Sequence, residues 1–434
     1  MQNITLQSLA DKYHNDTVLR EIAHYVCTHS NTISPLLDLQ CEEFPITHSM
    51  SVQIFVATAF TLLIISALIG NSVVMWIILY SKVMRRSFNF FLFNMAFADF
   101  LMALLNAGST WSFNFYYDWW FGNFCPINNF FGIAPTCISV FTMMVVSWDR
   151  CAAVVNPLRK RQMSARCTVF IILFIWLLAT VISLPAAIPA RVDRQYFYSI
   201  SKKNLNERKI CHNDFEYKFL YDNFLFAIQF VIPLFVLSFT YGRIVFTFRR
   251  NSFFANPSLT KAPQHMRAKR RVIKMLGLVV FIFMICWAPY QLYHLFLERL
   301  LTDFLVASYM YMCFYWMAMS ACVYNPIIYC YFNMRFRLGF RFAFRWLPCI
   351  SWTQQEHENN QLFPDIRPLT SSTALKPDLL NSRYNTHSSY SLGKHNDMSL
   401  THRKQQQLCR SNSSKKLLLS PVVTTDKLMS SNTK

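Results

Sequence analysis

The stretch "SVFTMMVVSWDRCAAVVNPL", residues Ser139 to Leu158, is an apolar run that is interrupted by one Asp–Arg pair. Asp149 and Arg150 stand where a membrane-spanning helix would leave the lipid. A charge at that depth is costly unless it is paired or reaches water. The stretch therefore predicts a transmembrane helix that keeps a charged pair at one end for a purpose other than stability.

Similar apolar segments recur along the chain. Of its 434 residues, 53% are hydrophobic and 15% are charged, whereas soluble proteins carry about 25% charged residues. Seven apolar runs are long enough to cross a bilayer core of about 30 Å. They lie near residues 52–80, 88–111, 124–148, 167–190, 219–242, 275–297 and 304–331. The sequence therefore predicts an all-α membrane protein in which residues 51–332 form a seven-transmembrane helix bundle.

The distribution of positive charge predicts the orientation of this bundle. Lys and Arg dominate the connections 81–87, 149–166 and 243–274, and also residues 335–345. Such segments stay in the cytoplasm. The net charge of +20 therefore reflects topology and not nucleic-acid binding, which would need a water-soluble basic domain. We expect a multi-pass protein of the plasma membrane, with its N-terminus outside, its C-terminus inside, and the first span as the targeting signal.

The N-terminal residues 1–50 are expected to form a polar extracellular tail. Two glycosylation sequons support this side, at Asn3 and Asn15. Four cysteines fall in extracellular positions, where disulfides persist. We predict that Cys125, at the outer end of span three, pairs with Cys211 in the 191–218 connection. The sequence leaves open whether Cys27 and Cys41 pair.

The segments after the bundle predict two further regions. Residues 333–349 space phenylalanines four apart with arginines between them, which predicts an amphipathic helix lying in the inner membrane interface. Cys349 at its end is a candidate for palmitoylation, although an unmodified thiol is the alternative. Residues 350–434 are rich in Ser, Asn, Thr and Gln and are expected to be a disordered cytoplasmic tail.

Polar residues and prolines inside the spans are the most informative ones. Asp99 lies near the bilayer centre, where a charge costs about 3 kcal/mol or more, so it is expected to face a wet interior. The prolines of "CWAPY" (286–290) and "YNPIIY" (324–329) each delete a helical hydrogen bond and open a kink. Two bent helices in one bundle can pivot, which indicates a protein that switches.

Together these residues resemble the signature of one family. One set occurs in each span, in the order Asn71, "LFNMAFAD" (92–99), Asp149–Arg150, Trp176, Pro233 with Tyr241, "CWAP" (286–289) and "NPIIY" (325–329). The chain thus resembles the rhodopsin-like G-protein-coupled receptors over about residues 51–349. The resemblance implies a receptor and not an enzyme, with a heterotrimeric G protein as its inner partner. It also implies that receptor kinases and arrestin act on the tail.

The resemblance assigns switching roles to particular residues. Arg150 is held by Asp149 at rest and helps to receive the G protein on activation. Further switch residues are Tyr241, Trp287, Pro289, Asn325, Pro326 and Tyr329. Asp99, Ser139, Asn71 and Asn325 match a central polar pocket that can hold a sodium ion, and no other cofactor is expected. Lys269 stands where some relatives have an acid, so no ionic latch joins spans three and six and appreciable basal activity is expected.

The ligand pocket excludes two ligand classes. Retinal needs a Schiff-base lysine in span seven, and residues 304–331 contain none. Amine receptors place an aspartate where this chain has Gly132. The aromatic stretch "TWSFNFYYDWWFGNFC" (110–125) favours a peptide ligand, although such rings also form the aromatic belt at a membrane surface.

A closer resemblance is to the tachykinin (neurokinin) receptors. It rests on "WMAMSACVYNPIIYCYFNMRFRLGFRFAFR" (316–345), "WWFGNFC" (119–125) and "DRCAAVVNPL" (149–158). The resemblance implies an amidated neuropeptide as ligand and signalling through the Gq–calcium route. The implied ligand-contacting residues are Asn106, Tyr290, Gln291 and Tyr311.

Departures from the vertebrate members affect the expected ligand. Ala186, Gln291 and Thr110 replace the residues that those receptors keep in the pocket, so we expect a ligand other than a vertebrate-type tachykinin. Acids at the rim would attract a cationic peptide, unless they are only solvated: Asp118, Asp222, Glu298 and Asp303. A receptor for an RYamide, RFamide or neuropeptide Y-like peptide is the alternative. A transporter is a remote one, because the sequence lacks inverted repeats with broken helices.

Overall fold

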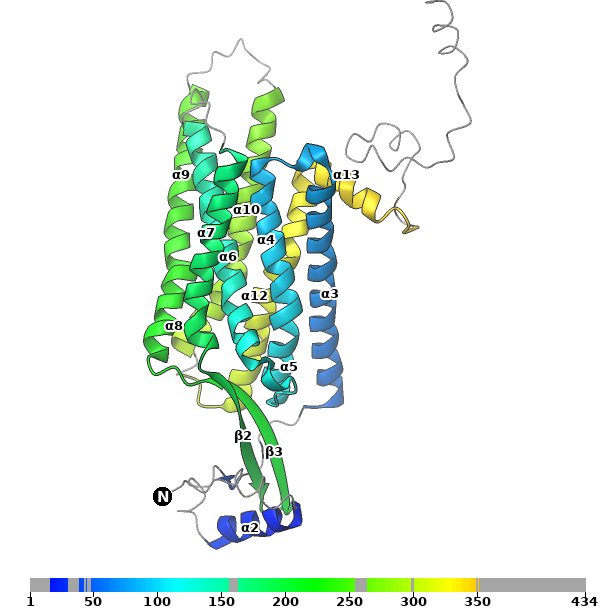
Figure 1. The fold of residues 1–434 in the computed structure, drawn as a ribbon, viewed down its shortest axis with the longest axis vertical. Helices are drawn as coiled ribbons and strands as arrows, with labels where there is room; N and C mark the ends of the chain where they lie inside the picture. Colours follow the sequence, from blue (N-terminus) through cyan, green and yellow to red (C-terminus); the bar gives the residue numbers. More distant parts are fainter. Residues whose placement is uncertain are drawn as a thin grey trace, which may run out of the picture. The chain divides into compact units, whose positions relative to one another are not determined.

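The computed structural model describes residues 16–29, 39–42, 44, 48–155, 163–253, 264–297, 300–348 and 350, with side chains except at 251–270. The chain divides into two units, Met1–Arg367 and Pro368–Lys434, and all described residues belong to the first. Seven helical spans in this described part are long and apolar enough to cross a membrane. They pack side by side as a bundle (Figure 1). The predicted seven-helix architecture is confirmed.

Several spans consist of more than one helical element. In chain order the elements of the bundle are α3 (Met50–Tyr80), α4 (Ser87–Met102), α5 (Gly108–Tyr116), α6 (Cys125–Val155), α7 (Ala165–Ala187), α8 (Lys218–Phe226), α9 (Ile232–Phe253), α10 (Gln264–Leu292) and α12 (Phe304–Phe332). Short 3₁₀ turns cover Lys82–Met84 and Gly122–Phe124. Spans two, five and six contain π-helical turns at Ala103–Ala107, Ala227–Val231 and Tyr293–Leu297. Such turns are rare and frequent at functional sites.

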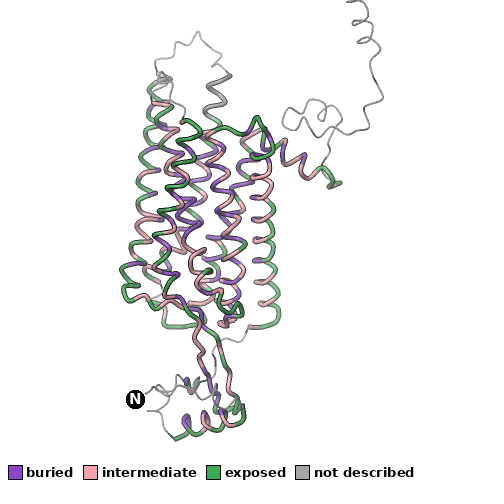
Figure 2. The backbone as a smooth tube through the Cα atoms, in the orientation of Figure 1, coloured by how far each residue is buried: buried purple, intermediate pink, exposed green. Residues whose placement is uncertain are grey.

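The bundle buries an apolar core and also carries large apolar side chains on its outer surface. Figure 2 shows buried positions facing the interior and exposed ones facing away. Large apolar side chains remain exposed on the outer surface, as at Phe55 (73%), Phe170 (74%) and Phe235 (71%). A soluble protein rarely leaves so much apolar surface open. This surface fits surrounding lipid and makes the chain a multi-pass membrane protein.

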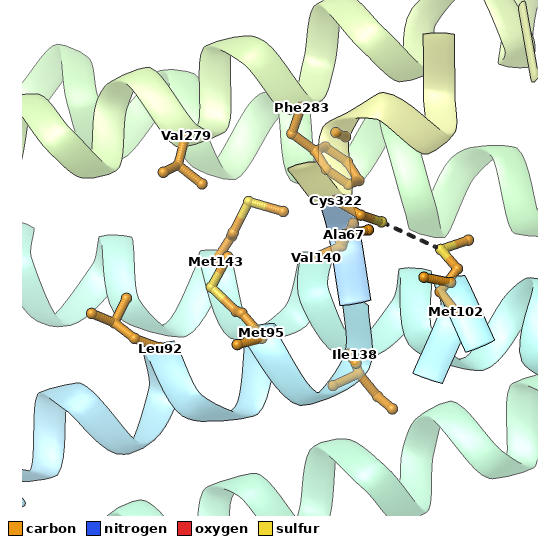
Figure 3. Packing of buried hydrophobic residues seen from close by; sticks show 14 of the residues in the cluster. Ala67, Leu92, Met95, Met102, Ile138, Val140, Met143, Val279, Phe283 and Cys322 are labelled. Atoms are coloured by element: carbon orange, nitrogen blue, oxygen red, sulfur yellow. Dashed lines mark hydrogen bonds between the residues drawn. The ribbon is translucent and has the colours of Figure 1, made fainter. Parts of the chain in front are cut away.

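The core of the bundle lies around α6, which packs against α4, α7 and α9. In the most apolar part of the span that contains α6, 67% of the residues are buried, against 28% in α7. Figure 3 shows the packing of this core, to which Met95 and Met102 of α4 and Met143 of α6 belong, and in which the Cys322 sulfur of α12 lies 4.0 Å from the Met102 sulfur. Methionine is flexible and fills irregular gaps, so such a core can repack when helices shift.

A small folded region stands at one end of the bundle. β2 (Ala190–Ser199) and β3 (Asn204–Asn213) form an antiparallel hairpin, and β1 (Leu39–Gln40) adds a parallel strand to β2. Helix α2 (Asp16–His29) packs on this hairpin through Leu19, Ala23 and Tyr198. A disulfide joins Cys27 to Cys41, which answers the question the sequence left open. Nothing in the hydropathy pattern predicted α2 or the hairpin.

We call this the hairpin end and the opposite one the Arg150 end. At the Arg150 end, α13 (Met334–Ala343) follows α12 and packs against α3. It buries Phe336 and Phe342 and leaves Arg335 and Arg337 exposed. The predicted amphipathic helix after span seven is therefore present, and its place in a membrane interface stays a prediction.

Candidate functional site

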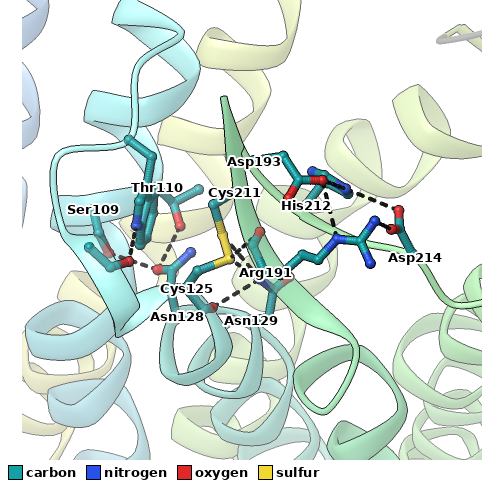
Figure 4. Close-up of a disulfide and its surroundings, with 12 residues drawn as sticks. Ser109, Thr110, Cys125, Asn128, Asn129, Arg191, Asp193, Cys211, His212 and Asp214 are labelled. Carbon is teal, nitrogen blue, oxygen red and sulfur yellow. Dashed lines mark hydrogen bonds and ion pairs between the residues drawn. A yellow bond between two sulfur atoms is a disulfide. The ribbon is translucent and has the colours of Figure 1, made fainter. Parts of the chain in front are cut away.

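A disulfide fixes the hairpin to the bundle. Cys211 of β3 is bonded to Cys125, the first residue of α6, as predicted (Figure 4). The fully buried Trp119 belongs to the same apolar cluster as both cysteines, and its backbone N–H donates to the carbonyl of Lys209 (2.7 Å). Asn129 of α6 donates its side-chain amide to the Cys211 sulfur (3.4 Å). The hairpin is thus anchored covalently and by backbone contact.

The four acids predicted at the rim differ in their contacts. Asp303 caps α12, and its carboxylate accepts two backbone N–H groups (2.9 and 3.2 Å). Asp118 accepts the backbone N–H of Lys209 (3.0 Å). Asp222 is exposed on α8, and Glu298 lies outside the described residues. Asp303 and Asp118 thus accept backbone N–H groups, and attraction of a peptide by any of the four acids stays a prediction.

Three tyrosines form what we call the aromatic wall: Tyr290 of α10 and Tyr311 and Tyr315 of α12. The ring centroid of Tyr290 lies 5.9 Å from that of Tyr311 and 6.0 Å from that of Tyr315. The rings of Tyr311 and Tyr315 stack at 5.8 Å. The structure thus brings together two of the predicted ligand contacts, Tyr290 and Tyr311. Gln291 is the next residue of α10 and is half-buried.

Asn106 of span two links spans three and seven next to the aromatic wall. It lies in the first π-helical turn and is buried. Its amide donates to the backbone carbonyl of Asn128 in α6 (3.0 Å), and its carbonyl accepts the Tyr315 hydroxyl (3.1 Å). Both ends of the side chain are therefore committed to α6 and α12. A ligand contact by Asn106 stays a prediction, whereas the positions of Asn128 and Tyr315 depend on it directly.

Gly132 allows α6 to approach this polar link. A Cβ atom at residue 132 would lie 3.1 Å from the Asn106 amide nitrogen, which is closer than most Cβ contacts. The residue that argued against an amine ligand therefore also makes room for the Asn106–Asn128 contact. Sequence reasoning missed Asn128 and Tyr315, because no spacing rule relates residues on three different spans.

A second polar group lies deeper, around Asp99 of α4. The side-chain amide of Asn325 donates to one carboxylate oxygen (2.7 Å), and the Ser139 hydroxyl donates to the other (3.4 Å). Asn71 donates its amide to the backbone carbonyls of Ala67 (2.9 Å) and Cys322 (3.0 Å) instead. Its own side-chain oxygen is buried without a hydrogen-bond partner. Three of the four residues predicted for the polar pocket thus meet directly.

The predicted switch residue Trp287 lies between the aromatic wall and the core. Its buried ring packs edge-on against Tyr290, with centroids 5.8 Å apart. It also stacks on Phe283 at 5.6 Å. Pro289 lies inside α10 between these contacts and the π-helical turn. The arrangement can transmit a push on Tyr290 to the middle of α10.

The switch residues of spans five and seven lie against glycines and sulfur. Pro326 lies inside α12, and a Cβ atom at Gly70 would be 3.1 Å from its ring. Tyr329 is fully buried, and its hydroxyl lies 3.9 Å from the Met95 sulfur. Similarly, a Cβ atom at Gly277 of α10 would lie 3.3 Å from the ring of Tyr241 in α9. Small residues thus let the neighbouring helices approach at these points.

The predicted charged pair is formed at the far end of α6. The Arg150 guanidinium contacts the Asp149 carboxylate at 2.7 Å, and their side chains are 30% and 19% exposed. The guanidinium also lies 4.4 Å above the ring of Phe88 in α4. Its Nε atom is buried and has no hydrogen-bond partner in the described part of the chain. The side chain of Lys269 lies outside the described side chains, and the lack of a latch between spans three and six stays a prediction.

Other predicted modification sites lie outside the described residues. These are Asn3 and Asn15 for glycosylation, Cys349 for palmitoylation, and the tail from residue 351. They stay predictions.

Comparisons with known proteins agree with this geometry. Residues 70–329 match the family of 7 transmembrane receptors (rhodopsin family). The chain is 48% identical to the probable G-protein coupled receptor tkr-1 of Caenorhabditis elegans. This match extends over 320 residues and covers 73% of this chain and 77% of that protein. It is 35% identical to the tachykinin-like peptides receptor 99D of Drosophila melanogaster (65% of this chain, 56% of that protein). It is also 35% identical to the substance-P receptor of Homo sapiens (68% and 72%).

The family match covers more than half of the chain, and the shared region includes all seven spans except the first part of α3 and the last residues of α12. This family is one of receptors and not a class of enzymes. The chain therefore belongs to the rhodopsin family of seven-transmembrane receptors and, within it, to the tachykinin-type peptide receptors.

Proposed function

We propose that this chain is a plasma-membrane receptor for an amidated tachykinin-like neuropeptide, and that it signals through heterotrimeric G proteins by the Gq–calcium route. The observation that carries the proposal is the aromatic wall of Tyr290, Tyr311 and Tyr315, whose rings α10 and α12 bring together. Stacked and tilted rings suit the aromatic and apolar residues of a short peptide. The names of the relatives support the peptide class.

In this proposal the hairpin end faces the outside of the cell. Disulfides persist there, and both disulfides of the described chain lie at this end. The Arg150 end would face the cytoplasm, because its exposed residues are strongly basic. These residues include Lys82, Arg85, Arg86, Arg335 and Arg337.

The same orientation assigns roles to the regions outside the bundle. Residues 1–50 would be an extracellular tail glycosylated at Asn3 and Asn15. Residues 333–349 would form the interfacial helix, anchored by palmitoylation of Cys349. Residues 350–434 would be the cytoplasmic tail on which receptor kinases and arrestin act.

Ligand binding acts on the bundle through Tyr290. A peptide side chain that presses on this ring moves Trp287, which is packed against it, and alters the bend at Pro289. The other end of α10 then moves away from Tyr241, which it contacts at Gly277. This movement opens a cavity at the Arg150 end, where Arg150 leaves its ion pair with Asp149 and contacts the G protein.

The polar group around Asp99 fits a sodium ion. Carboxylate and hydroxyl oxygens are hard ligands that suit such a cation, and the unpartnered side-chain oxygen of Asn71 is a further one. No lysine or arginine in the described part of the chain forms an ion pair with Asp99. In the proposed receptor Asp99, Ser139, Asn71 and Asn325 would hold the ion, which supplies the missing positive charge. Helix movement at Asn325 would open this group.

A calcium assay tests the proposal. Cells that express the full chain are challenged with amidated peptides ending in Phe-x-Gly-x-Arg, Phe-x-Gly-Leu-Met or Arg-Tyr. We expect a sub-micromolar response to a Phe-x-Gly peptide, and at least a tenfold loss of potency in Tyr311→Ala with surface expression kept. Tyr331→Ala is the matched control, because Tyr331 lies on the same helix and is 73% exposed; its potency should not change.

Other outcomes separate the alternatives. A response to Arg-Tyr peptides alone would keep the receptor and replace the tachykinin assignment by the RYamide or neuropeptide Y-like one. Silence across the panel in both calcium and cyclic-AMP assays would contradict the proposed ligand class. An equal loss in Tyr311→Ala and Tyr331→Ala would contradict the role of the aromatic wall.

A further inference from the structure

Three metal-binding side chains converge where β3 leaves the hairpin. Asp193 lies on β2, His212 lies on β3, and Asp214 follows β3 directly. In the antiparallel register Arg191 faces His212 and Asp193 faces Ile210. Residues two apart on a strand point to the same face, so Asp193, His212 and Asp214 share one face. Figure 4 shows them together with Arg191, beside the disulfide.

Their spacing is that of a zinc ligand set. The Nε2 atom of His212 lies 3.3 Å from Oδ2 of Asp193 and 3.0 Å from Oδ1 of Asp214. One ligand atom from each residue lies within 4.8 Å of the others. A tetrahedral zinc ion with bonds of about 2.0–2.2 Å holds its ligand atoms about 3.3–3.6 Å apart. The separations of His212 Nε2 from Asp193 and from Asp214 are therefore within a few tenths of an ångström of those in a zinc site.

The hydrogen bonds of a neutral His212 do not balance the negative charges of Asp193 and Asp214. Nε2 of a neutral histidine carries at most one hydrogen, yet it faces two carboxylates. The cation now serving them is Arg191, which contacts Asp193 at 3.2 Å and Asp214 at 2.5 Å. The Arg191 side chain is 62% exposed, so its guanidinium can swing into water without losing buried contacts.

Solvent ions can reach the group. Arg191, Asp193, His212 and Asp214 all line a cavity of about 430 Å³ between the hairpin and β1. The side chains of His212, Asp193 and Asp214 are 33%, 43% and 44% exposed. One imidazole with two carboxylates favours Zn²⁺ over Ca²⁺, which takes oxygen ligands only. A water molecule from the cavity can supply the fourth ligand.

We propose that Asp193, His212 and Asp214 form a Zn²⁺ site in which the ion displaces the guanidinium of Arg191. His212 adjoins the disulfide-bonded Cys211, and Asp214 begins the connection to α8. The ion thus ties that connection to β2 and restricts how far the hairpin can move from α8. The site does not depend on the identity of the peptide.

Zinc titration of the purified full-length protein tests the site. Calorimetry with Zn²⁺ alone should give one site that His212→Ala weakens at least tenfold, while Mg²⁺ and Ca²⁺ give no comparable binding. Arg191→Met removes the competing cation, so it should strengthen zinc binding severalfold. The matched control is His24→Ala, because His24 lies on α2 and contacts Tyr198; its zinc affinity should equal that of the unmodified chain.

Contrary results are equally distinct. Equal zinc affinity in His212→Ala and the unmodified chain would overturn the site, and so would weaker binding in Arg191→Met. Asp193→Asn keeps the size of the side chain and should also lose binding, which guards against misfolding as the cause. Because the titration needs no peptide, its result is separate from the calcium assay of the proposed function.

Discussion

The two ends of the bundle hold their polar and charged groups in different ways. At the hairpin end, two disulfides, a three-stranded sheet and the Asn106 contacts join several elements at once. At the Arg150 end, one ion pair of 2.7 Å holds Asp149 and Arg150, and the Nε atom of Arg150 has no hydrogen-bond partner in the described chain. Cross-linked groups keep one geometry, whereas an ion pair and a ring contact on the same side chain are more easily exchanged. The proposed binding end is therefore preorganised, and the proposed signalling end is ready to change partners.

Removal of the disulfide between β3 and α6 should disturb the preorganised hairpin end more than any other substitution considered below. Cys125 and Cys211 are 86 residues apart in sequence, and Cys27 and Cys41 are 14 apart. By loop-closure entropy, the long loop contributes about 4–5 kcal/mol and the short one about 3 kcal/mol. We expect Cys125→Ser with Cys211→Ser to abolish peptide binding and to lower the apparent melting temperature of the purified receptor the most.

The second disulfide provides the comparison. Cys27→Ser with Cys41→Ser should lower the melting temperature less and should keep peptide binding, because this disulfide connects α2 only to the residue that follows β1. Equal effects of the two double variants would contradict the view that the anchor to α6, and not cross-linking as such, organises the pocket.

The Asn106 link should give the next largest effect. Asn106→Ala removes the acceptor of the Tyr315 hydroxyl and a donor to the Asn128 carbonyl, and losing such buried hydrogen bonds costs about 1–3 kcal/mol. We expect a loss of stability of about 2 kcal/mol together with a tenfold or greater loss of peptide affinity. Both are measured on purified receptor, by thermal unfolding and by ligand binding.

Tyr315→Phe separates positioning from direct ligand contact. It removes only the hydroxyl that Asn106 accepts, worth about 1 kcal/mol. If Asn106 acts by positioning, the double variant should lose less affinity than the sum of the two single losses. Strict additivity would instead indicate that Asn106 contacts the peptide independently of Tyr315.

A smaller effect is expected where α13 packs on α3. A Cβ atom at Gly339 would lie 2.6 Å from Cδ1 and 2.7 Å from Cγ1 of the fully buried Ile77. Overpacking costs about 1–3 kcal/mol, and the helix propensity of alanine returns about 1 kcal/mol. Gly339→Ala should therefore destabilise the receptor by about 1 kcal/mol, seen as a lower melting temperature.

Gly242→Ala is the matched glycine at the same end. A Cβ atom there meets nothing within 4 Å, so the substitution should be neutral or stabilising by up to about 1 kcal/mol. If both variants shift the melting temperature in the same direction, the α13–α3 packing does not limit stability.

The difference between the two ends also explains what the sequence could predict. All seven spans and the Asp149–Arg150 pair follow from apolar length and charge position, which are local properties, and the Cys125–Cys211 disulfide follows from the extracellular positions of these two cysteines. At the Arg150 end, the charged pair and the helix after span seven were therefore predicted, whereas the Arg150–Phe88 contact and the packing of Gly339 near Ile77 were not. The two predicted features depend on residues that are close together in sequence.

The hairpin end was predicted less well, because its contacts join distant segments. The hairpin Ala190–Ser199 and Asn204–Asn213 has charged residues on both strands and no apolar alternation to mark it. The link from Asn106 to Tyr315 spans 209 residues, and its π-helical turn contains no proline or glycine. Tertiary packing selects these features, and only known relatives could have indicated Asn106 beforehand.

The smallest predicted effect concerns the exchangeable pair itself. Asp149→Asn removes the charge that holds Arg150. The two side chains are 30% and 19% exposed, so the pair contributes at most about 1 kcal/mol to the resting state. A difference of that size changes an equilibrium about fivefold. We therefore expect basal calcium signalling to rise up to about fivefold at equal surface expression, without loss of peptide affinity.

Charge-conserving substitution decides whether the ion pair or the side-chain shape sets this balance. Asp149→Glu keeps a carboxylate next to Arg150 and should leave basal signalling within about twofold of the unmodified receptor, since most of the pair's interaction is retained. A rise in Asp149→Glu as large as in Asp149→Asn would mean that geometry, and not charge, holds Arg150 at rest. No rise in either variant would place the restraint on other contacts of Arg150, of which the Phe88 ring at 4.4 Å is the nearest described one. Phe88→Leu would then be expected to raise basal signalling where Asp149→Asn does not.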